Sequence, residues 1–71
     1  MRILKLNLER LKQSRKDNEL SQENMVKELG WKSRSQYSKR ESGSVSIGAD
    51  ELIAIAKILG YSKEEMGYFF D

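Results

Sequence analysis

The feature that most constrains this chain is the segment Ser21–Gly43, SQENMVKELGWKSRSQYSKRESG, which predicts two short helices joined by a turn. Ser21 is a favourable N-cap, because its hydroxyl can accept a hydrogen bond from an unpaired N–H of the first turn. Three apolar residues then follow at a spacing that places them on one helical face: Met25, Val26 and Leu29. Gly30 stands where a helix commonly ends in the left-handed conformation that glycine adopts without strain. A first helix is therefore predicted between Ser21 and Gly30.

The second helix of this segment is basic. We expect it to run from Arg34 to Glu41 after Ser33 as N-cap, and its only large apolar side chain is Tyr37. Residues 32–40 include four basic side chains and no acidic one. Basic side chains neutralise phosphates, and Arg and Gln can also read base edges. The pattern indicates a helix suited to a groove of DNA, with the Tyr37 ring buried and its hydroxyl reaching a partner or solvent.

This region resembles the helix-turn-helix of the phage-repressor (Xre/Cro, lambda-repressor-like) family. The usual family pattern is an arginine, then LSQE, an apolar pair, LG, a short turn, and a helix that closes in E-x-G. The residues that match in order and spacing are Arg15, Leu20-Ser21-Gln22-Glu23, Met25-Val26, Leu29-Gly30 and Glu41-Ser42-Gly43. The resemblance extends over roughly residues 8–66, and its strength lies in the order of the matches rather than in any one of them.

The predicted fold class is all-α, a compact five-helix lambda-repressor-like domain with the helix-turn-helix at helices two and three. Residues 1–71 are short enough to be a single domain. Apolar spacing predicts a first helix over about residues 7–17, with Leu4 continuing its apolar face by one turn, and a strongly apolar fourth helix over about residues 49–59. Ser62 and Glu65 form a capping-box pattern that opens a short fifth helix, ending near residue 69.

Four positions depart from the family pattern. The turn is one residue longer than usual, because Trp31 and Lys32 stand where one residue is typical. Val26 replaces a small residue, while Arg40 and Ser14 replace apolar ones. We expect Trp31 to cover the core between helices rather than to contact DNA. Turns tolerate insertions, so the longer turn affects the register of the second motif helix rather than the fold.

The resemblance implies that the second helix of the motif enters the major groove. Residues that surround a buried Tyr37 on the opposite face would be exposed, and Arg34 could bind a guanine through two hydrogen bonds. Gln22 would contact a phosphate beside a helix N-terminus, where free N–H groups attract anions. The expected DNA-binding residues are Gln22, Lys32, Ser33, Arg34, Ser35, Ser38, Lys39, Ser42 and Ser44. A simple solvated surface is the alternative reading of these side chains.

Arg15 and Glu41 resemble a family ion pair between the first helix and the end of the third. A bidentate bond there would orient the recognition helix rather than add net stability, because burial of both ions offsets most of their attraction. Charge is also distributed unevenly: the net charge of +2 divides into +5 over residues 1–46 and −3 over residues 47–71. Such polarity would orient the molecule in the field of a phosphate backbone, although a mixed solvated surface gives the same numbers.

Several functions are disfavoured by composition. The chain has no cysteine and no histidine, which removes the usual transition-metal ligands and the commonest general base, so no metal or cofactor is expected. Glu64 and Glu65 have no base partner, and we expect no enzyme activity. The absence of cysteine suits a reducing compartment, and a cytoplasmic protein of bacterial or phage origin is expected. No apolar run approaches the ~18 residues of a membrane span, so no membrane partner is expected.

The sequence therefore predicts a sequence-specific DNA-binding transcriptional regulator, a repressor of prophage or mobile-element type. The alternative is a helical protein-interaction or antitoxin module with the same fold. Members of the family commonly bind palindromic operators as homodimers. Residues 68–70 are three consecutive aromatics that cannot all face one core, so we expect a weak homodimer through this segment. Otherwise Tyr68 and Phe69 would fold back on the core while Phe70 frays.

Overall fold

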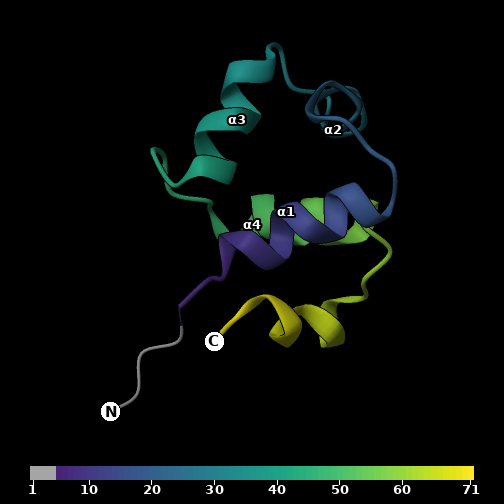
Figure 1. The fold of residues 1–71 in the computed structure, drawn as a ribbon, viewed down its shortest axis with the longest axis vertical. Coiled ribbons are helices and arrows are strands. Elements are labelled where there is room, and N and C mark those ends of the chain that lie inside the picture. Colours follow the sequence, from purple (N-terminus) through teal and green to yellow (C-terminus); the bar gives the residue numbers. More distant parts are fainter. Residues whose placement is uncertain (1–4) are drawn as a thin grey trace.

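The computed structural model describes residues 5–71 and arranges them as four α-helices followed by a 3-10 helix (Figure 1). The elements are α1 (Leu8–Asp17), α2 (Gln22–Leu29), α3 (Arg34–Ser42), α4 (Ala49–Ile58) and η1 (Lys63–Phe69). The predicted all-α, five-helix fold is confirmed, and the fifth element is a 3-10 helix. The expected extension of the first helix to Leu4 lies outside the described residues.

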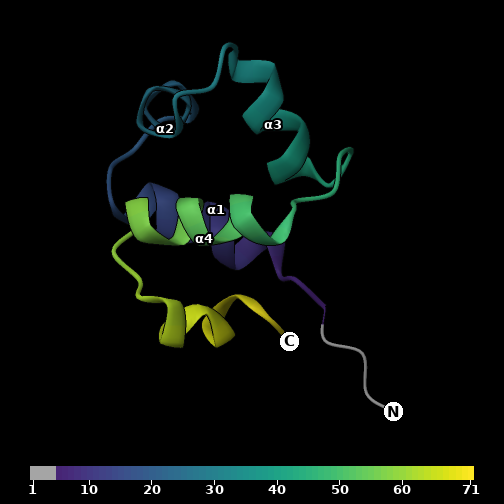
Figure 2. The ribbon, with the colours of Figure 1, turned by 180° about the vertical axis from the view of Figure 1, so that it is seen from behind.

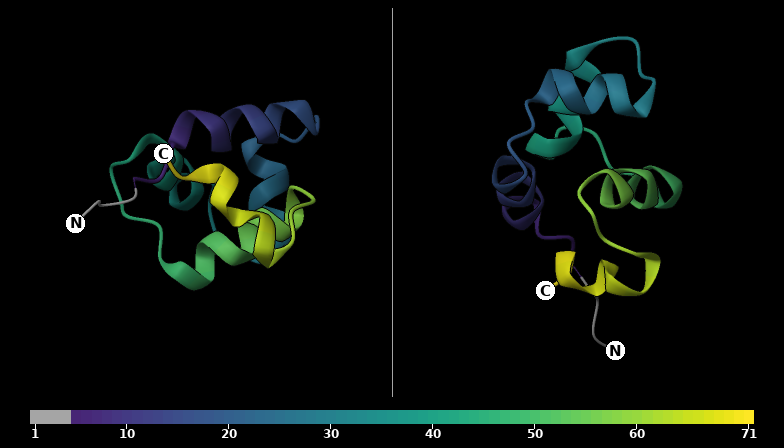
Figure 3. Two further views of the ribbon diagram at one scale, coloured as in Figure 1. Left: turned by 90° about the horizontal axis from the view of Figure 1, so that it is seen from below. Right: turned by 90° about the vertical axis from the view of Figure 1, so that its right-hand side faces the viewer.

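The helices form three levels. α2 and α3 lie at one end, α1 and α4 occupy the middle, and η1 closes the opposite end (Figures 1 and 3). Every helix contributes to one core, whose buried side chains are Leu11, Met25, Tyr37, Leu52, Ile55, Ala56, Leu59 and Phe69. The predicted apolar stripe supplies four of these residues, three from α4 and Leu59 at its C-cap, because positions three and four apart in a helix share one face.

Two predicted helix ends are confirmed around α2. The Ser21 hydroxyl accepts a hydrogen bond from the Asn24 N–H at 3.0 Å, and the Asn24 side chain accepts one from the Ser21 N–H at 2.9 Å. These reciprocal bonds satisfy two N–H groups that the first turn leaves unpaired. Gly30 ends the helix with a φ of +72°, and Trp31 then donates its N–H to the carbonyl of Val26 at 3.0 Å.

The carboxyl-terminal segment packs back on the beginning of the described chain. The Asn7 N–H donates to the Phe69 carbonyl at 2.6 Å, the Asp71 N–H donates to the Lys5 carbonyl at 2.8 Å, and Leu6 and Phe70 form an antiparallel bridge. The fraying of Phe70, which is part of the alternative to a dimer contact, is therefore wrong, because its backbone is paired.

The three aromatic side chains of this segment take different positions. Phe69 is fully buried and contacts Tyr61 edge to face, with 4.9 Å between ring centroids. Tyr68 stacks on Tyr61 with 5.5 Å between ring centroids and remains 49% exposed, which confirms that one of the three stays on the surface. A dimer contact through Phe69 is excluded by its burial, and that part of the expected interface is wrong.

One departure from the family pattern has a direct partner in this fold. Ser14 is buried in α1, where family members carry an apolar residue, and its hydroxyl lies 3.5 Å from the Tyr61 hydroxyl. A buried hydroxyl without a partner would destabilise the fold, so this neighbour explains why serine is tolerated there.

Candidate DNA-binding interface

The turn between α2 and α3 carries the inserted residue. Trp31 is half-buried, packs against the core, and lies 6.3 Å from the Tyr37 ring between centroids. The prediction that Trp31 covers the core is confirmed. Because its ring packs inward, the extra residue is absorbed at the turn, and α3 still begins directly after it at Arg34.

The start of α3 is capped differently from the prediction. Ser33 is the N-cap residue, but its hydroxyl makes no capping bond and instead lies 3.3 Å from the Ser35 hydroxyl. The Gln36 side chain accepts hydrogen bonds from the N–H groups of Lys32 at 2.9 Å and Ser33 at 3.2 Å. Gln36 thus occupies two backbone donors that a phosphate could otherwise use, and only the side chains of Lys32 and Ser33 stay exposed.

The two faces of α3 differ in exposure. Tyr37 and Glu41 are buried on the inner face, whereas Arg34, Ser35 and Lys39 are exposed on the outer one. Ser38 is half-buried at the border between the faces. Within residues 5–71, Arg34 and Lys39 are outside the three ion pairs, which are Arg10–Asp71, Arg15–Glu41 and Arg40–Glu51. Their positive charges therefore face solvent without being neutralised by these pairs.

The Tyr37 ring is fully buried, as predicted, but its hydroxyl has no hydrogen-bond partner among the described residues. The Glu41 carboxylate and the Arg15 guanidinium are charged neighbours of this hydroxyl and both act on its pKa, although neither is placed well enough to complete a hydrogen bond. Burial raises the pKa of the Tyr37 hydroxyl well above its ordinary value, so the group is neutral at all physiological pH values.

Arg15 and Glu41 form a buried, bidentate ion pair between α1 and α3. Arg15 Nε donates to Glu41 Oε2 at 2.9 Å and Nη2 donates to Oε1 at 3.0 Å. Arg15 Nη1 also donates to the Leu20 carbonyl at 2.7 Å, which fixes the turn between α1 and α2. Burial alone would raise the pKa of the Glu41 carboxyl, but the hydrogen bonds from Arg15 hold that pKa below its ordinary value. The hydrogen bond to Glu41 in turn raises the pKa of Arg15.

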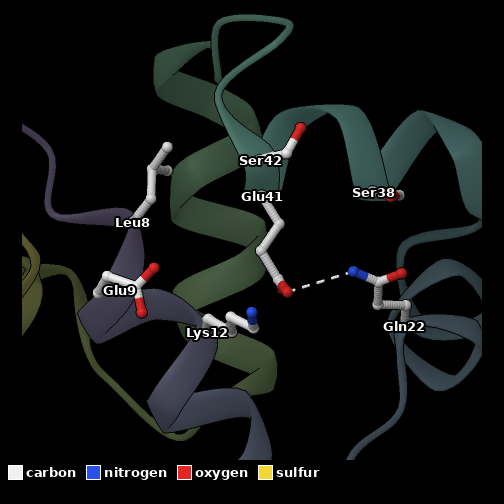
Figure 4. Close-up of a pocket in the computed structure, with 7 residues that line it drawn as sticks. All are labelled: Leu8, Glu9, Lys12, Gln22, Ser38, Glu41 and Ser42. Carbon is white, nitrogen blue, oxygen red and sulfur yellow. Dashed lines mark hydrogen bonds between the residues drawn. The ribbon is translucent and has the colours of Figure 1, made fainter.

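Gln22 joins this pair from α2. Its Nε2 donates to Glu41 Oε1 at 3.2 Å across a hollow of about 280 Å³ (Figure 4). An amide nitrogen carries two hydrogens, so one remains for a second acceptor. Glu41 therefore connects three helices, because it accepts bonds from Arg15 in α1 and from Gln22 in α2. The orientation of Gln22 is set by the same carboxylate that holds α3.

Lys12 lines the same hollow and was missed in the sequence analysis. It reaches into the hollow from α1, opposite Gln22, with Glu41 between them (Figure 4). The signal for Lys12 was present in the spacing, because Leu8, Lys12 and Arg15 follow at i, i+4 and i+7 on one face of α1. Because Arg15 on this face of α1 was expected to contact Glu41, the same face should also bring Lys12 close to α3.

A second ion pair holds the opposite side of α3 and was also missed. Arg40 Nε donates to Glu51 Oε1 in α4 at 3.0 Å, and Nη1 donates to the Gln36 carbonyl at 2.8 Å. The Arg40 guanidinium lies over the Trp31 ring, 4.8 Å from its centroid. Both residues are departures from the family pattern, and the structure shows that they contact each other. The inserted residue of the turn and the unusual arginine therefore form one unit with Glu51.

The two serines expected to contact the DNA backbone lie at the end of α3. Ser42 Oγ donates to the Lys39 carbonyl at 3.1 Å, and Ser44 Oγ lies 3.1 Å from Ser42 Oγ. Both side chains are exposed, but the Ser42 proton is used within the protein. A phosphate contact there requires one of these internal bonds to be exchanged.

Other kinds of site are not indicated by the described part of the chain. Residues 5–71 contain no group of three acidic, cysteine or histidine side chains placed to hold a metal ion. None of the helices in this range has the length and apolar character that crossing a membrane requires.

Comparison with known proteins agrees with this geometry. A family model described as Helix-turn-helix matches residues 11–66, which include α2, the lengthened turn and α3. Comparisons with curated proteins and with solved structures gave no match. The family match covers well over half of the chain, and the matched residues include Arg15 and Glu41, whose hydrogen bonds orient α3. The chain therefore belongs to the Xre-type, lambda-repressor-like helix-turn-helix family, which consists of DNA-binding transcription regulators.

Proposed function

We propose that this protein is a sequence-specific transcriptional repressor of prophage or mobile-element type that reads the major groove with α3. The observation that carries the proposal is the division of α3 into two faces. Its inner face is fixed by Tyr37 and by the buried Arg15–Glu41 pair. Its outer face presents Arg34, Ser35 and Lys39 to solvent. A rigidly held helix with exposed donors can place them at base edges with little loss of freedom on binding.

The residues around α3 are suited to contacts with the DNA backbone. Gln22 keeps one amide hydrogen available beside the N-terminus of α2, and Lys12 lies across the same hollow. Lys32 is exposed in the turn before α3. Such contacts position a protein on the duplex without selecting its sequence. Ser33, Ser38, Ser42 and Ser44 would add neutral donors along the same surface.

We further propose that the protein acts as a weak homodimer on a palindromic operator. Two copies of α3 would then enter successive major grooves about one DNA turn apart, ~34 Å. A dimer doubles the number of base contacts, and a weak one can assemble on the operator itself.

The test begins with selection of bound fragments from a random duplex library, which supplies the operator. Arg34→Ala should weaken binding to that operator about tenfold or more and relax preference at one base pair. Lys39→Ala should weaken binding to all sequences and reduce the dependence on salt. Lys57→Ala is the matched control, because Lys57 is an exposed lysine at the end of α4, away from α3.

Thermal unfolding of the variants checks that the effects arise from binding, since surface changes alter stability by only about 0.5 kcal/mol. Unchanged operator affinity in both α3 variants would contradict the proposed role of this helix. Absence of any binding to duplex DNA at low salt would contradict DNA binding as such and favour the protein-interaction alternative.

A further inference from the structure

The first turn of α3 is ordered by a side chain that is itself exposed. The Gln36 side chain accepts hydrogen bonds from the N–H groups of Lys32 and Ser33, while the Ser33 hydroxyl makes no capping bond. An exposed glutamine loses rotamer freedom when it forms such bonds, and this entropy offsets part of their free energy. The bonds are therefore strengthened by any other contact that holds the turn before α3 against the first turn of the helix.

Arg40 supplies such contacts from the last turn of α3. Its guanidinium lies over the Trp31 ring, 4.8 Å from the centroid, and Nη1 donates to the Gln36 carbonyl at 2.8 Å. Side chains in a helix tilt toward its N-terminus, so an arginine near the end of α3 can reach back along it. One side chain therefore contacts both the lengthened turn and the residue that caps α3.

Arg40 is in turn fixed by α4. Arg40 Nε donates to Glu51 Oε1 at 3.0 Å, and the same oxygen accepts a hydrogen bond from the Gly48 N–H at 2.9 Å. The turn after α2 leads into one end of α3, and the loop to α4 leaves the other end (Figures 1 and 2). The Arg40 side chain thus links the beginning of α4 to the turn that precedes α3.

Arg40 is placed to act on DNA binding through other residues. Its side chain is 21% exposed, and Nε and Nη1 are both used within the protein. The exposed side chains of Lys32 and Arg34 lie directly beside the turn that Arg40 holds. A donor fixed before binding loses less freedom on binding than a mobile one, and a bidentate contact to a base requires one defined orientation.

We propose that Arg40 is a positioning residue for base recognition, which holds the lengthened turn so that Arg34 meets its base in one orientation. The inference deepens the proposed function and rests on it, because the position of Arg34 matters only if Arg34 reads a base. Arg40 acts through its contacts with Trp31, Gln36 and Glu51. The inserted turn residue and the unusual arginine then contribute to specificity as well as to stability.

The first experiment needs no DNA and measures amide hydrogen exchange by NMR in wild type and Arg40→Lys. Lysine keeps the charge but loses the planar stacking and the forked bonds, so the N–H groups of Lys32 and Ser33 should exchange about threefold faster or more. The Ser21 N–H is an internal control, because it makes the same kind of capping bond to Asn24 at 2.9 Å in α2. Its exchange should stay constant. Unchanged exchange at Lys32 and Ser33 would overturn the inference.

The second experiment is a double-mutant cycle on the selected operator, measured well below the unfolding transition of every variant. Arg40→Lys should weaken binding about fivefold in the wild-type background and less than about twofold in the Arg34→Ala background, where the base contact is already lost. Reduced stability alone would weaken binding equally in both backgrounds, so equal effects would overturn the inference. Library selection with Arg40→Lys should also relax preference at the same base pair as selection with Arg34→Ala.

Two further variants separate positioning from other roles of an arginine. Arg40→Met removes the charge and should leave the salt dependence of binding unchanged, whereas a smaller salt slope would make Arg40 a phosphate contact and overturn the inference. Arg10→Lys is the matched control at the η1 end of the molecule. Arg10 also lies over an aromatic ring, 5.6 Å from the Tyr68 centroid, and pairs with Asp71 at 3.7 Å. This variant should leave operator affinity unchanged.

The inference and the proposed function can fail separately. If Arg34→Ala weakens operator binding but the cycle is additive, the proposed function stands and the inference is overturned. If wild type binds no duplex DNA, the proposed function is contradicted, and the role of Arg40 in base recognition falls with it. Amide exchange then decides on its own whether Arg40 positions the turn.

Discussion

Arg40 and Glu41 are neighbours on α3, yet each forms an ion pair on a different side of the helix. Glu41 pairs with Arg15 of α1, and the two side chains are 3% and 9% exposed. Arg40 pairs with Glu51 of α4, and these side chains are 21% and 32% exposed. The two pairs have similar bond lengths of 2.9 Å and 3.0 Å. The distances alone would suggest that the two pairs contribute equally to stability, but the first pair is buried and the second is partly exposed to water.

The difference shows how burial changes the role of an ion pair. The buried pair is stabilised by further hydrogen bonds to Leu20 and Gln22, and either ion left alone at so buried a position would be costly. The half-exposed pair is screened by water, so its charges contribute little. Arg40 instead contributes by stacking on Trp31 and by bonding the Gln36 carbonyl. The Arg15–Glu41 pair therefore orients α3 through its charges. The Arg40–Glu51 pair orients it through the planar guanidinium, which stacks on Trp31.

The largest effect is expected from Arg15→Met. This change leaves the Glu41 carboxylate buried without its partner and should reduce the free energy of unfolding by about 3–5 kcal/mol, measured by urea denaturation. The variant Arg15→Met with Glu41→Leu removes both ions and should recover most of that loss. If the double variant is no more stable than the single one, the loss does not come from an uncompensated charge.

The next largest difference between the two ion pairs is expected in how the free energy of unfolding depends on pH. The pKa of Glu41 is held below its ordinary value of 4.5, so its stabilising contribution is fully present above about pH 4.5 and is lost as the pH falls through the lowered pKa. The difference in unfolding free energy between wild type and Glu41→Gln should therefore shrink from pH 7 to pH 3. The hydrogen bond from Arg40 also lowers the pKa of Glu51, but Glu51→Gln should change the profile less because water screens this site. Equal changes in the two variants would contradict the distinction.

The smallest effect is expected at the half-exposed pair. Arg40→Lys keeps the charge beside Glu51 but loses the planar stacking on Trp31 and the forked bonds, and should reduce stability by about 1 kcal/mol. Glu51→Gln keeps the stacking and should cost about 0.5 kcal/mol or less. Trp31 fluorescence provides a direct readout, because its emission should change in Arg40→Lys and stay constant in Glu51→Gln. The opposite result would assign the contact to charge rather than stacking.

Local patterns were sufficient to predict most of the fold. The α4 stripe, the caps at Ser21 and Gly30, and the burial of Tyr37 depend on residues a few positions apart in the sequence. The boundary of α3 was also found, but Ser33 and Gln36 are both polar residues able to cap it. Which of them caps depends on side-chain rotamers and on the path of the lengthened turn. The general preference for serine as an N-cap therefore predicted Ser33, whereas Gln36 makes the capping bonds.

Contacts between distant segments were harder to predict. Arg40 and Trp31 were both recognised as unusual, but their stacking depends on the angle between the turn and α3. The pairing of Phe70 with Leu6 joins residues from opposite ends of the chain, and no periodicity relates them. The outward direction of Arg34 and Lys39 follows from the Tyr37 anchor, while their role in binding DNA stays a prediction.

The junction of residues 5–7 with residues 69–71 has a consequence for the order of folding. Its hydrogen bonds join positions as far apart as Lys5 and Asp71, which are 66 residues apart, whereas the contacts within α2 and α3 are local. Closure of a long loop carries a large entropy cost that local contacts avoid. We expect this junction to form late and to open first, which would expose Phe69 while α2 and α3 remain paired. Amide hydrogen exchange should then be fastest in η1 and slowest in α4, where the core is densest.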